Sequence, residues 1–113
     1  MEKGKAVLVK KLTEYACIET TLRILGYKTT KPKHINSNGT DLFAIKEDFT
    51  SVLSVEVKRA VKLNGKNIFR IRKVTRVNDD LIAIAFPCGY VIIEPMRDHL
   101  KCCNNHGDRF IRL

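Results

Sequence analysis

The sequence predicts a protein of mixed α/β (α+β) class. One helix is followed by a run of short strands and then by a short final helix. Three observations support this prediction. The 113 residues fall within the usual size of one domain. Apolar residues recur at helical spacing near the N-terminus, and short β-branched runs separated by turn-forming residues fill the middle. Residues 1–113 are expected to form a single domain, because no repeat, linker or low-complexity tract divides them.

The first helix is predicted over residues 12–25. Tyr15, Ile18 and Leu22 recur at spacings of three and four, which gives one apolar stripe. Gly26 follows directly, and glycine is the commonest residue just beyond a helix C-terminus. The stripe predicts that this helix packs one face against the rest of the domain.

Runs rich in apolar and β-branched residues predict the strands, and clusters of Gly, Pro, Asn and Asp predict the turns between them. The Pro87-Cys88-Gly89 turn, for example, predicts a hairpin. The expected strands cover residues 27–30, 40–46, 51–60, 68–74, 81–86 and 90–94, and a last helix covers residues 96–103 before a C-terminal tail.

Composition and charge narrow the class of function. Hydrophobic residues make up 44% and charged residues 29%, which is typical of a globular protein, and the apolar runs are too short to span a bilayer. The N-terminus has no signal-peptide pattern, so an intracellular, cytoplasmic location is expected, with the nucleoid or phage DNA if the source is prokaryotic. The 21 Lys and Arg against 12 Asp and Glu give a net charge of +9. This surplus indicates a polyanionic partner, above all nucleic acid. No membrane partner is expected, because the apolar runs are too short to span a bilayer.

The four cysteines favour reduced thiols over disulfides. No CxxC pair is present, and adjacent cysteines such as Cys102 and Cys103 do not readily bridge to each other. A zinc clip of His99, Cys102, Cys103 and His106 is the alternative, although its spacing is not that of the common zinc fingers. His99 and His106 are otherwise expected on the surface.

The residues that carry chemistry are Asp41, Glu56 and Lys58. Side chains alternate along a strand, so Glu56 and Lys58 share one face while Val55 and Val57 face the core. Charges beside a core are costly unless they are paired or bound to a metal. The alternative interpretation is a surface hairpin with an ordinary ion pair, which is worth less than about 1 kcal/mol.

The length of the preceding turn decides whether Asp41 joins this face. A loop over residues 47–50 places Asp41 opposite Glu56, and a loop over residues 48–51 places it opposite Lys58. Either register puts the three side chains on one face, whereas a five-residue loop without a bulge would turn Asp41 away. Two facing carboxylates repel each other unless a divalent cation such as Mg²⁺ lies between them. A nearby lysine can orient or help deprotonate the attacking water and stabilise charge on phosphate, so the triplet suits phosphodiester hydrolysis.

The segment Gly39-Thr40-Asp41-Leu42-Phe43-Ala44-Ile45, followed by Val55-Glu56-Val57-Lys58, resembles the PD-(D/E)xK nuclease superfamily. This superfamily includes restriction enzymes, Holliday-junction resolvases and some homing endonucleases. Glu14 and the Gly26-Tyr27 pair resemble its first helix, and the resemblance covers roughly residues 12–95. Thr40 stands where many members have Pro. The resemblance implies a restriction-endonuclease-like core, in which a mixed sheet is flanked by helices.

Carried over to this sequence, the resemblance assigns catalytic roles to Asp41, Glu56, Lys58 and Glu14. Asp41 and Glu56 would hold Mg²⁺, for which Mn²⁺ can substitute, and the Val57 carbonyl would add a ligand. Lys58 would be the base or the group that orients water. Glu19 is the rival to Glu14 as the acidic residue of the helix.

Basic residues near this triplet are the candidate DNA contacts. Arg70 and Arg72 alternate with apolar residues and should leave one strand face, and phosphate contacts of this kind position DNA without reading its sequence. The alternative is a solvated sheet face. The full candidate set is Lys31, Lys33, Arg59, Lys62, Lys66, Arg70, Arg72 and Lys73.

The sequence therefore predicts a divalent-metal-dependent DNA endonuclease, either structure-specific as in junction resolution or site-specific as in homing and restriction. The alternative is a non-catalytic nucleic-acid-binding module. A homodimer is compatible with the enzyme, because one such site cuts one strand and the resemblance points to dimeric relatives.

Overall fold

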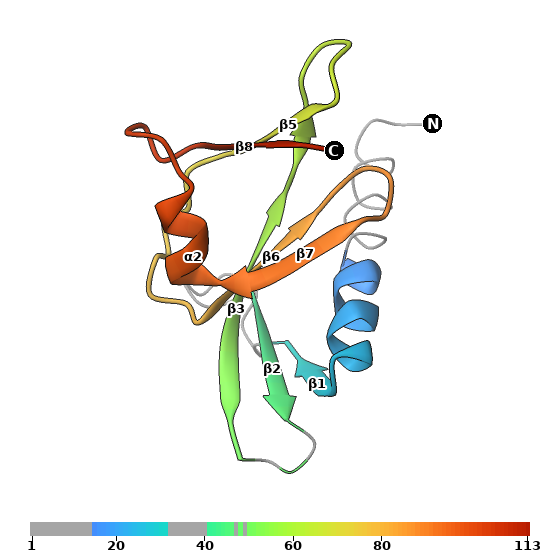
Figure 1. Cartoon of the computed structure of the whole chain (residues 1–113). Helices are drawn as coiled ribbons and strands as arrows, with labels where there is room; N and C mark the ends of the chain where they lie inside the picture. Colours follow the sequence, from blue (N-terminus) through green and yellow to red (C-terminus); the bar gives the residue numbers. More distant parts are fainter. Residues whose placement is uncertain (1–14, 32–40, 47, 49) are drawn as a thin grey trace, which may run out of the picture.

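The computed structural model describes residues 15–31, 41–46, 48 and 50–113 (Figure 1). An N-terminal helix covers residues 15–24 and ends at Gly26, whose φ of 92° and N–H bond to the Arg23 carbonyl are those of a left-handed cap. The other elements are β1 (Tyr27–Thr30), β2 (Leu42–Lys46), β3 (Val52–Arg59), β4 (Val61–Lys62), β5 (Ile68–Ile71), β6 (Leu81–Ala85), β7 (Val91–Pro95), α2 (Met96–Lys101) and β8 (Arg109–Arg112).

The main sheet has five strands in the order β1-β2-β3-β6-β7 and is mixed. The β3–β6 pair is parallel, and the other three pairs are antiparallel. This is the predicted mixed sheet flanked by helices, and the predicted hairpin around residues 87–89 joins β6 to β7. Neither helix in the described part of the chain has the length and apolar character needed to cross a membrane.

Two apolar clusters pack on opposite faces of this sheet, and β6 contributes to both. Ala83 and Ala85 pack with Ile18 and Leu22 of the N-terminal helix. The alternate β6 residues, Ile82 and Ile84, pack with residues of β5 and α2. Strict alternation on a strand buried on both faces explains why 81–86 forms a continuous apolar run. Glu56 and Lys58 are the β3 partners of Ile82 and Ile84, so they share the face of the second cluster.

The structure also contains a second sheet that the sequence did not predict. It has three antiparallel strands in the order β4-β5-β8. The prediction of a C-terminal tail was wrong over β8. Ile111 packs against the core beside Phe69, and the backbone of β5 pairs with that of β8. The strand predicted over 68–74 ends at Ile71, since the Lys73 N–H instead donates to the Asp108 carboxylate at 3.1 Å.

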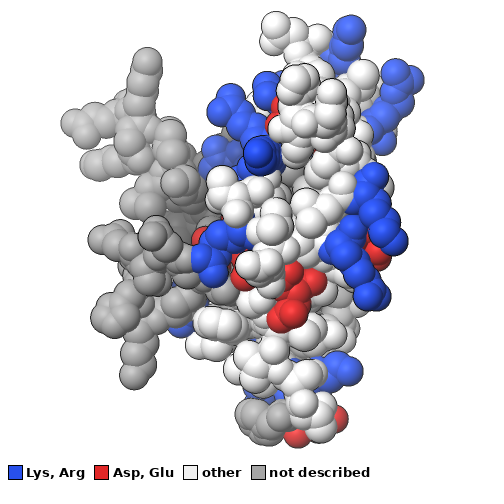
Figure 2. All heavy atoms as spheres, turned by 90° about the vertical axis from the view of Figure 1, so that its left-hand side faces the viewer, with Lys and Arg blue, Asp and Glu red and all other residues white. Residues whose placement is uncertain are grey.

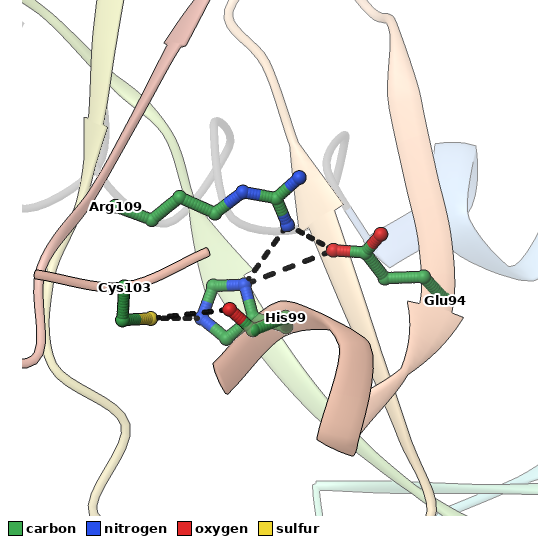
Figure 3. Close-up of polar contacts among 4 residues, drawn as sticks. All are labelled: Glu94, His99, Cys103 and Arg109. Carbon is green, nitrogen blue, oxygen red and sulfur yellow. Dashed lines mark hydrogen bonds and ion pairs between the residues drawn. The ribbon is translucent and has the colours of Figure 1, made fainter. Parts of the chain in front are cut away.

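A buried polar cluster fastens α2 to β7 and β8, and Figure 3 shows its four side chains. His99 lies at its centre with no exposed surface, so the prediction of a surface histidine was wrong there. Arg109 pairs with Glu94 and also lies 3.1 Å from His99 Nδ1. Cys103 Sγ lies 3.5 Å from His99 Nε2. The six-residue helix is too short to reveal its buried side from sequence periodicity, which explains the error.

The expectation of reduced cysteines is confirmed, since all four thiols are free. Cys102 and His106 are exposed, as expected for His106, whereas His99 is buried and Cys103, which contacts it, is partly buried. Across the described residues, no three His, Cys, Asp or Glu side chains are grouped to hold a metal ion. The zinc clip is therefore not supported.

The buried histidine predicts a pH-dependent contribution to stability. Burial, and then the Arg109 and Lys58 charges, lower the pKa of His99 against the opposing effect of Glu94. Because the unfolded chain takes up this proton more readily, the stabilisation is present above the ordinary pKa of His and is lost as the pH falls. We expect His99→Gln to lower the free energy of unfolding by about 2 kcal/mol at pH 7.5 and by less at pH 5. Urea titrations of both proteins at the two pH values measure this difference, and a constant difference would contradict the account.

Candidate active site

The β2–β3 hairpin sets the position of the candidate acidic pair. The Lys46 N–H donates to the Ser51 carbonyl at 3.2 Å, so the loop covers residues 47–50. This is the register in which Asp41 comes opposite Glu56, the first of the two that were predicted. Lys58 follows two positions further along β3, on the same face as Glu56. The geometric requirement for the triplet is therefore met.

The Asp41 carboxylate closes the end of the ladder. Its Oδ2 accepts the Val57 N–H at 3.0 Å. The last Cα pair of the two strands is Leu42 with Val55, so the Val57 N–H has no backbone partner on β2. The Asp41 side chain accepts this N–H instead. This bond holds one carboxylate oxygen against β3 and leaves the other for a further partner.

Glu56 is the most perturbed carboxyl of the site. It is only 8% exposed, and its Oε2 has no hydrogen-bond partner among the described residues. Burial first, and then the charge of Asp41, raise the pKa of Glu56 to about 8, against the opposing effect of Lys58. A buried carboxyl group with an unsatisfied oxygen is costly for stability, and such groups gather at functional sites.

Asp79 is a site residue that the sequence did not reveal. Its buried carboxyl group forms a hydrogen bond with Glu56, and its Oδ2 lies 3.9 Å from Arg76 Nε. The neighbouring Asp80 fixes this turn, because its Oδ2 accepts the Ser54 N–H at 2.9 Å. In the sequence this acidic segment is only a break between strands. Its contact with β3 depends on the parallel β3–β6 pairing, which a local pattern does not show.

An open cleft of about 650 Å³ adjoins the acidic pair. Asp41 and Lys58 both line it, so a carboxylate and an ammonium group face the same space. Among the described residues Lys58 has no ion-pair partner within 4.0 Å, which leaves its charge available to a ligand. The cleft is lined by Tyr15, Asp41, Val57, Lys58, Arg59, Val61 and Arg72.

Tyr15 closes the cleft from the N-terminal helix. Burial first, and then the charges of Asp41 and Glu56, raise its pKa to about 12, so the phenol keeps its proton. The Lys31 ammonium lies 5.2 Å from the centre of the Tyr15 ring, within cation–π range. From the sequence Tyr15 was only a member of the helix stripe. No feature of the sequence set it apart from the other residues of that stripe.

Glu14 and Glu19 both stay candidates for the acidic residue of the first helix. Glu14 lies outside the described residues, as does Lys33 of the predicted DNA contacts. Glu19 pairs with Arg23 at 3.8 Å and with Lys31 at 3.6 Å. The Glu19 carboxylate therefore already lies between two cations.

The residues present fit a site for a hard divalent cation. Two carboxylates, Asp41 and Glu56, face each other across the hairpin, and one oxygen of Glu56 is buried without a hydrogen bond. Mg²⁺ is commonly bound by one or two carboxylates, with water and phosphate oxygens completing its shell. The Val57 backbone lies between Glu56 and Lys58 on the same strand, so its carbonyl is a further candidate ligand.

The predicted DNA contacts differ in their distance from the cleft. Arg59 and Arg72 line it directly, and Arg70 is held by Asp108 at 2.8 Å. Figure 2 shows Lys and Arg side chains along the upper part and one edge of a face of the molecule, with smaller acidic groups between them. The remaining described candidates, Lys31, Lys62, Lys66 and Lys73, are exposed.

The mixed sheet and its helical cover form the fold of a protein of known structure. A solved structure described as that of a bacterial homing endonuclease, I-Ssp6803I, superposes with a TM-score of 0.71 over 92% of this chain and 73% of the other. The two sequences are 14% identical, so the similarity establishes the fold. No protein-family model and no curated protein sequence matches the chain.

Proposed function

We propose that this protein is a divalent-metal-dependent DNA endonuclease whose active site contains Asp41, Glu56 and Lys58. The observation that carries the proposal is that the β2–β3 register brings Asp41 opposite Glu56, while Asp41 and Lys58 line one open cleft. The fold shared with a homing endonuclease supports the same activity. The net charge of +9 supports DNA as the partner.

In this proposal Asp41 and Glu56 bind Mg²⁺, with the Val57 carbonyl as a further ligand, and Mn²⁺ substitutes for it. The bound cation would supply a Lewis acid that polarises the scissile phosphate and lowers the pKa of a water molecule. Lys58 donates hydrogen bonds from the side of the cleft, orients the attacking water and stabilises the negative charge that develops on phosphate. Arg59 and Arg72 contact the DNA backbone and hold the phosphate in line with the water.

Each site cuts one strand, so cleavage of both strands requires two sites, which a homodimer supplies. The described structure favours the enzyme over a binding module in one respect. A binding surface gains nothing from a buried Glu56 oxygen without a hydrogen bond, because a buried polar atom without a partner weakens the fold.

Asp41→Asn tests the proposal with little disturbance of the fold. The asparagine oxygen can still accept the Val57 N–H, while one negative charge is lost from the metal site. We expect nicking of supercoiled plasmid in Mg²⁺ to fall by about 10²- to 10³-fold, while DNA affinity in EDTA is kept or rises. A wild-type protein that binds DNA but cuts no supercoiled, linear or branched DNA with Mg²⁺ or Mn²⁺ would instead be a binding module.

A further inference from the structure

The three-stranded sheet has one covered face and one open face. Phe69 and Ile71 of β5 belong to the buried core, so the alternate residues leave the other side. Across the strands, Arg70 is the Cα partner of both Val61 and Phe110. These three side chains therefore form one row on the open face. Phe110 is 50% exposed and Val61 is 49% exposed, so both present apolar surface to solvent.

The row leads out of the active-site cleft. Val61 and Arg72 line the cleft together with Asp41 and Lys58. Neighbouring strands are about 4.8 Å apart, so Phe110 lies roughly 10 Å from Val61 across two strand spacings. A strand of DNA that enters the cleft from the side of β8 would pass over the row.

The chemistry of the row suits an unpaired base. Arg70 is the cross-strand partner of Phe110, and its guanidinium pairs with Asp108 at 2.8 Å, which restricts its side chain. Arg112, two positions along β8, leaves the same face and is exposed. An exposed aromatic flanked by arginines on an open sheet is the arrangement by which sheet-based modules stack single-stranded bases. A phenylalanine has no donor or acceptor with which to read the edge of a paired base.

We infer that the open face of the three-stranded sheet binds unpaired bases of the DNA substrate, with Phe110 stacking on a base and Arg70 and Arg112 contacting the backbone. This inference rests on the proposed function for the direction of the DNA, and it narrows the substrate to DNA with an unpaired segment beside the cleavage site. Such DNA includes gaps, forks and junctions.

The test compares the binding of two DNAs by fluorescence anisotropy in EDTA: a fully paired duplex, and the same duplex with a short single-stranded gap. We expect the wild-type protein to prefer the gapped DNA, and Phe110→Leu to weaken gapped-DNA binding by about tenfold. Leucine keeps the apolar contact and removes the ring, while Phe110→Tyr, which keeps the ring, should retain the preference. Val52→Ala, an exposed apolar residue at the far end of β3, is the matched control and should also retain it.

Equal binding of gapped DNA by Phe110→Leu and the wild-type protein would overturn the inference. A wild-type dimer that becomes monomeric in Phe110→Leu on sedimentation would also overturn it, because the face would then be a contact between two copies. Binding in EDTA is independent of cleavage, so a protein that cuts no DNA would defeat the proposed function and leave this comparison informative.

Discussion

Replacing Lys58 by alanine is expected to lower Mg²⁺-dependent cleavage of supercoiled plasmid by about 10²- to 10³-fold, the usual effect of removing one group that stabilises the transition state. We expect this loss because Lys58 lines the cleft together with Asp41 and has no ion-pair partner among the described residues. Single-turnover nicking with the enzyme in excess measures the effect on the chemical step.

Two companion variants separate this effect from packing and from charge. Lys58→Met keeps the apolar stem of the side chain and should be as inactive as Lys58→Ala. Lys46→Ala loses the same charge at the opposite end of β2, roughly 16 Å along the strand from Asp41, and should cleave normally. Retained cleavage in Lys58→Met would contradict the proposed role of the ammonium group.

Glu56→Gln is expected to abolish cleavage and, unusually, to stabilise the metal-free protein at alkaline pH. The pKa of Glu56 rises from 4.5 to about 8 on folding, chiefly through burial and the Asp41 charge. The folded protein therefore holds a proton that the unfolded chain releases, and its free energy of unfolding falls as the pH rises from about 4.5 to about 8. Glutamine has no charge to bury, so the variant should gain about 2 kcal/mol at pH 8.5 and little at pH 5.

Urea titrations in EDTA at these two pH values measure the gain. Asp98→Asn, an exposed carboxyl group on α2, is the control and should change little at either pH. Adding Mg²⁺ at pH 8.5 should stabilise the wild-type protein and leave Glu56→Gln nearly unchanged, because only a protein that binds the ion gains from it. If Glu56→Gln is less stable than the wild type at pH 8.5, the Glu56 carboxylate stabilises the metal-free fold. Metal binding would then no longer explain why the burial of this carboxylate is tolerated.

The site geometry could be predicted from the sequence because strand alternation is strict. Val55 and Val57 fix the buried face of β3, so Glu56 and Lys58 must share the other. Both four-residue loops considered for the hairpin brought Asp41 to that face, whereas a five-residue loop would have turned it away. The prediction therefore depended on a loop of four residues, and the Lys46–Ser51 bond confirms that length. The strands of the main sheet were placed to within one or two residues for the same reason.

Features that depend on distant contacts were not predictable. The β8 strand forms because its backbone pairs with β5, which lies far away in the sequence, and its Arg109-Phe110-Ile111-Arg112 segment carries only a weak alternating pattern. His99 is buried by packing between α2, β7 and β8, and no local signal distinguishes it from a surface histidine. Asp79 reaches Glu56 through the parallel pairing of β3 with β6.

Manganese anomalous scattering from crystals grown with Mn²⁺ tests the metal site most directly. The account predicts one strong peak between the Asp41 and Glu56 carboxylates, at about 2.0–2.2 Å from an oxygen of each, as expected for a small divalent ion, and no such peak in crystals of Asp41→Asn. Ordered carboxylates with no peak between them, or a peak bound elsewhere in the molecule, would contradict the proposal that these two residues form the catalytic metal site.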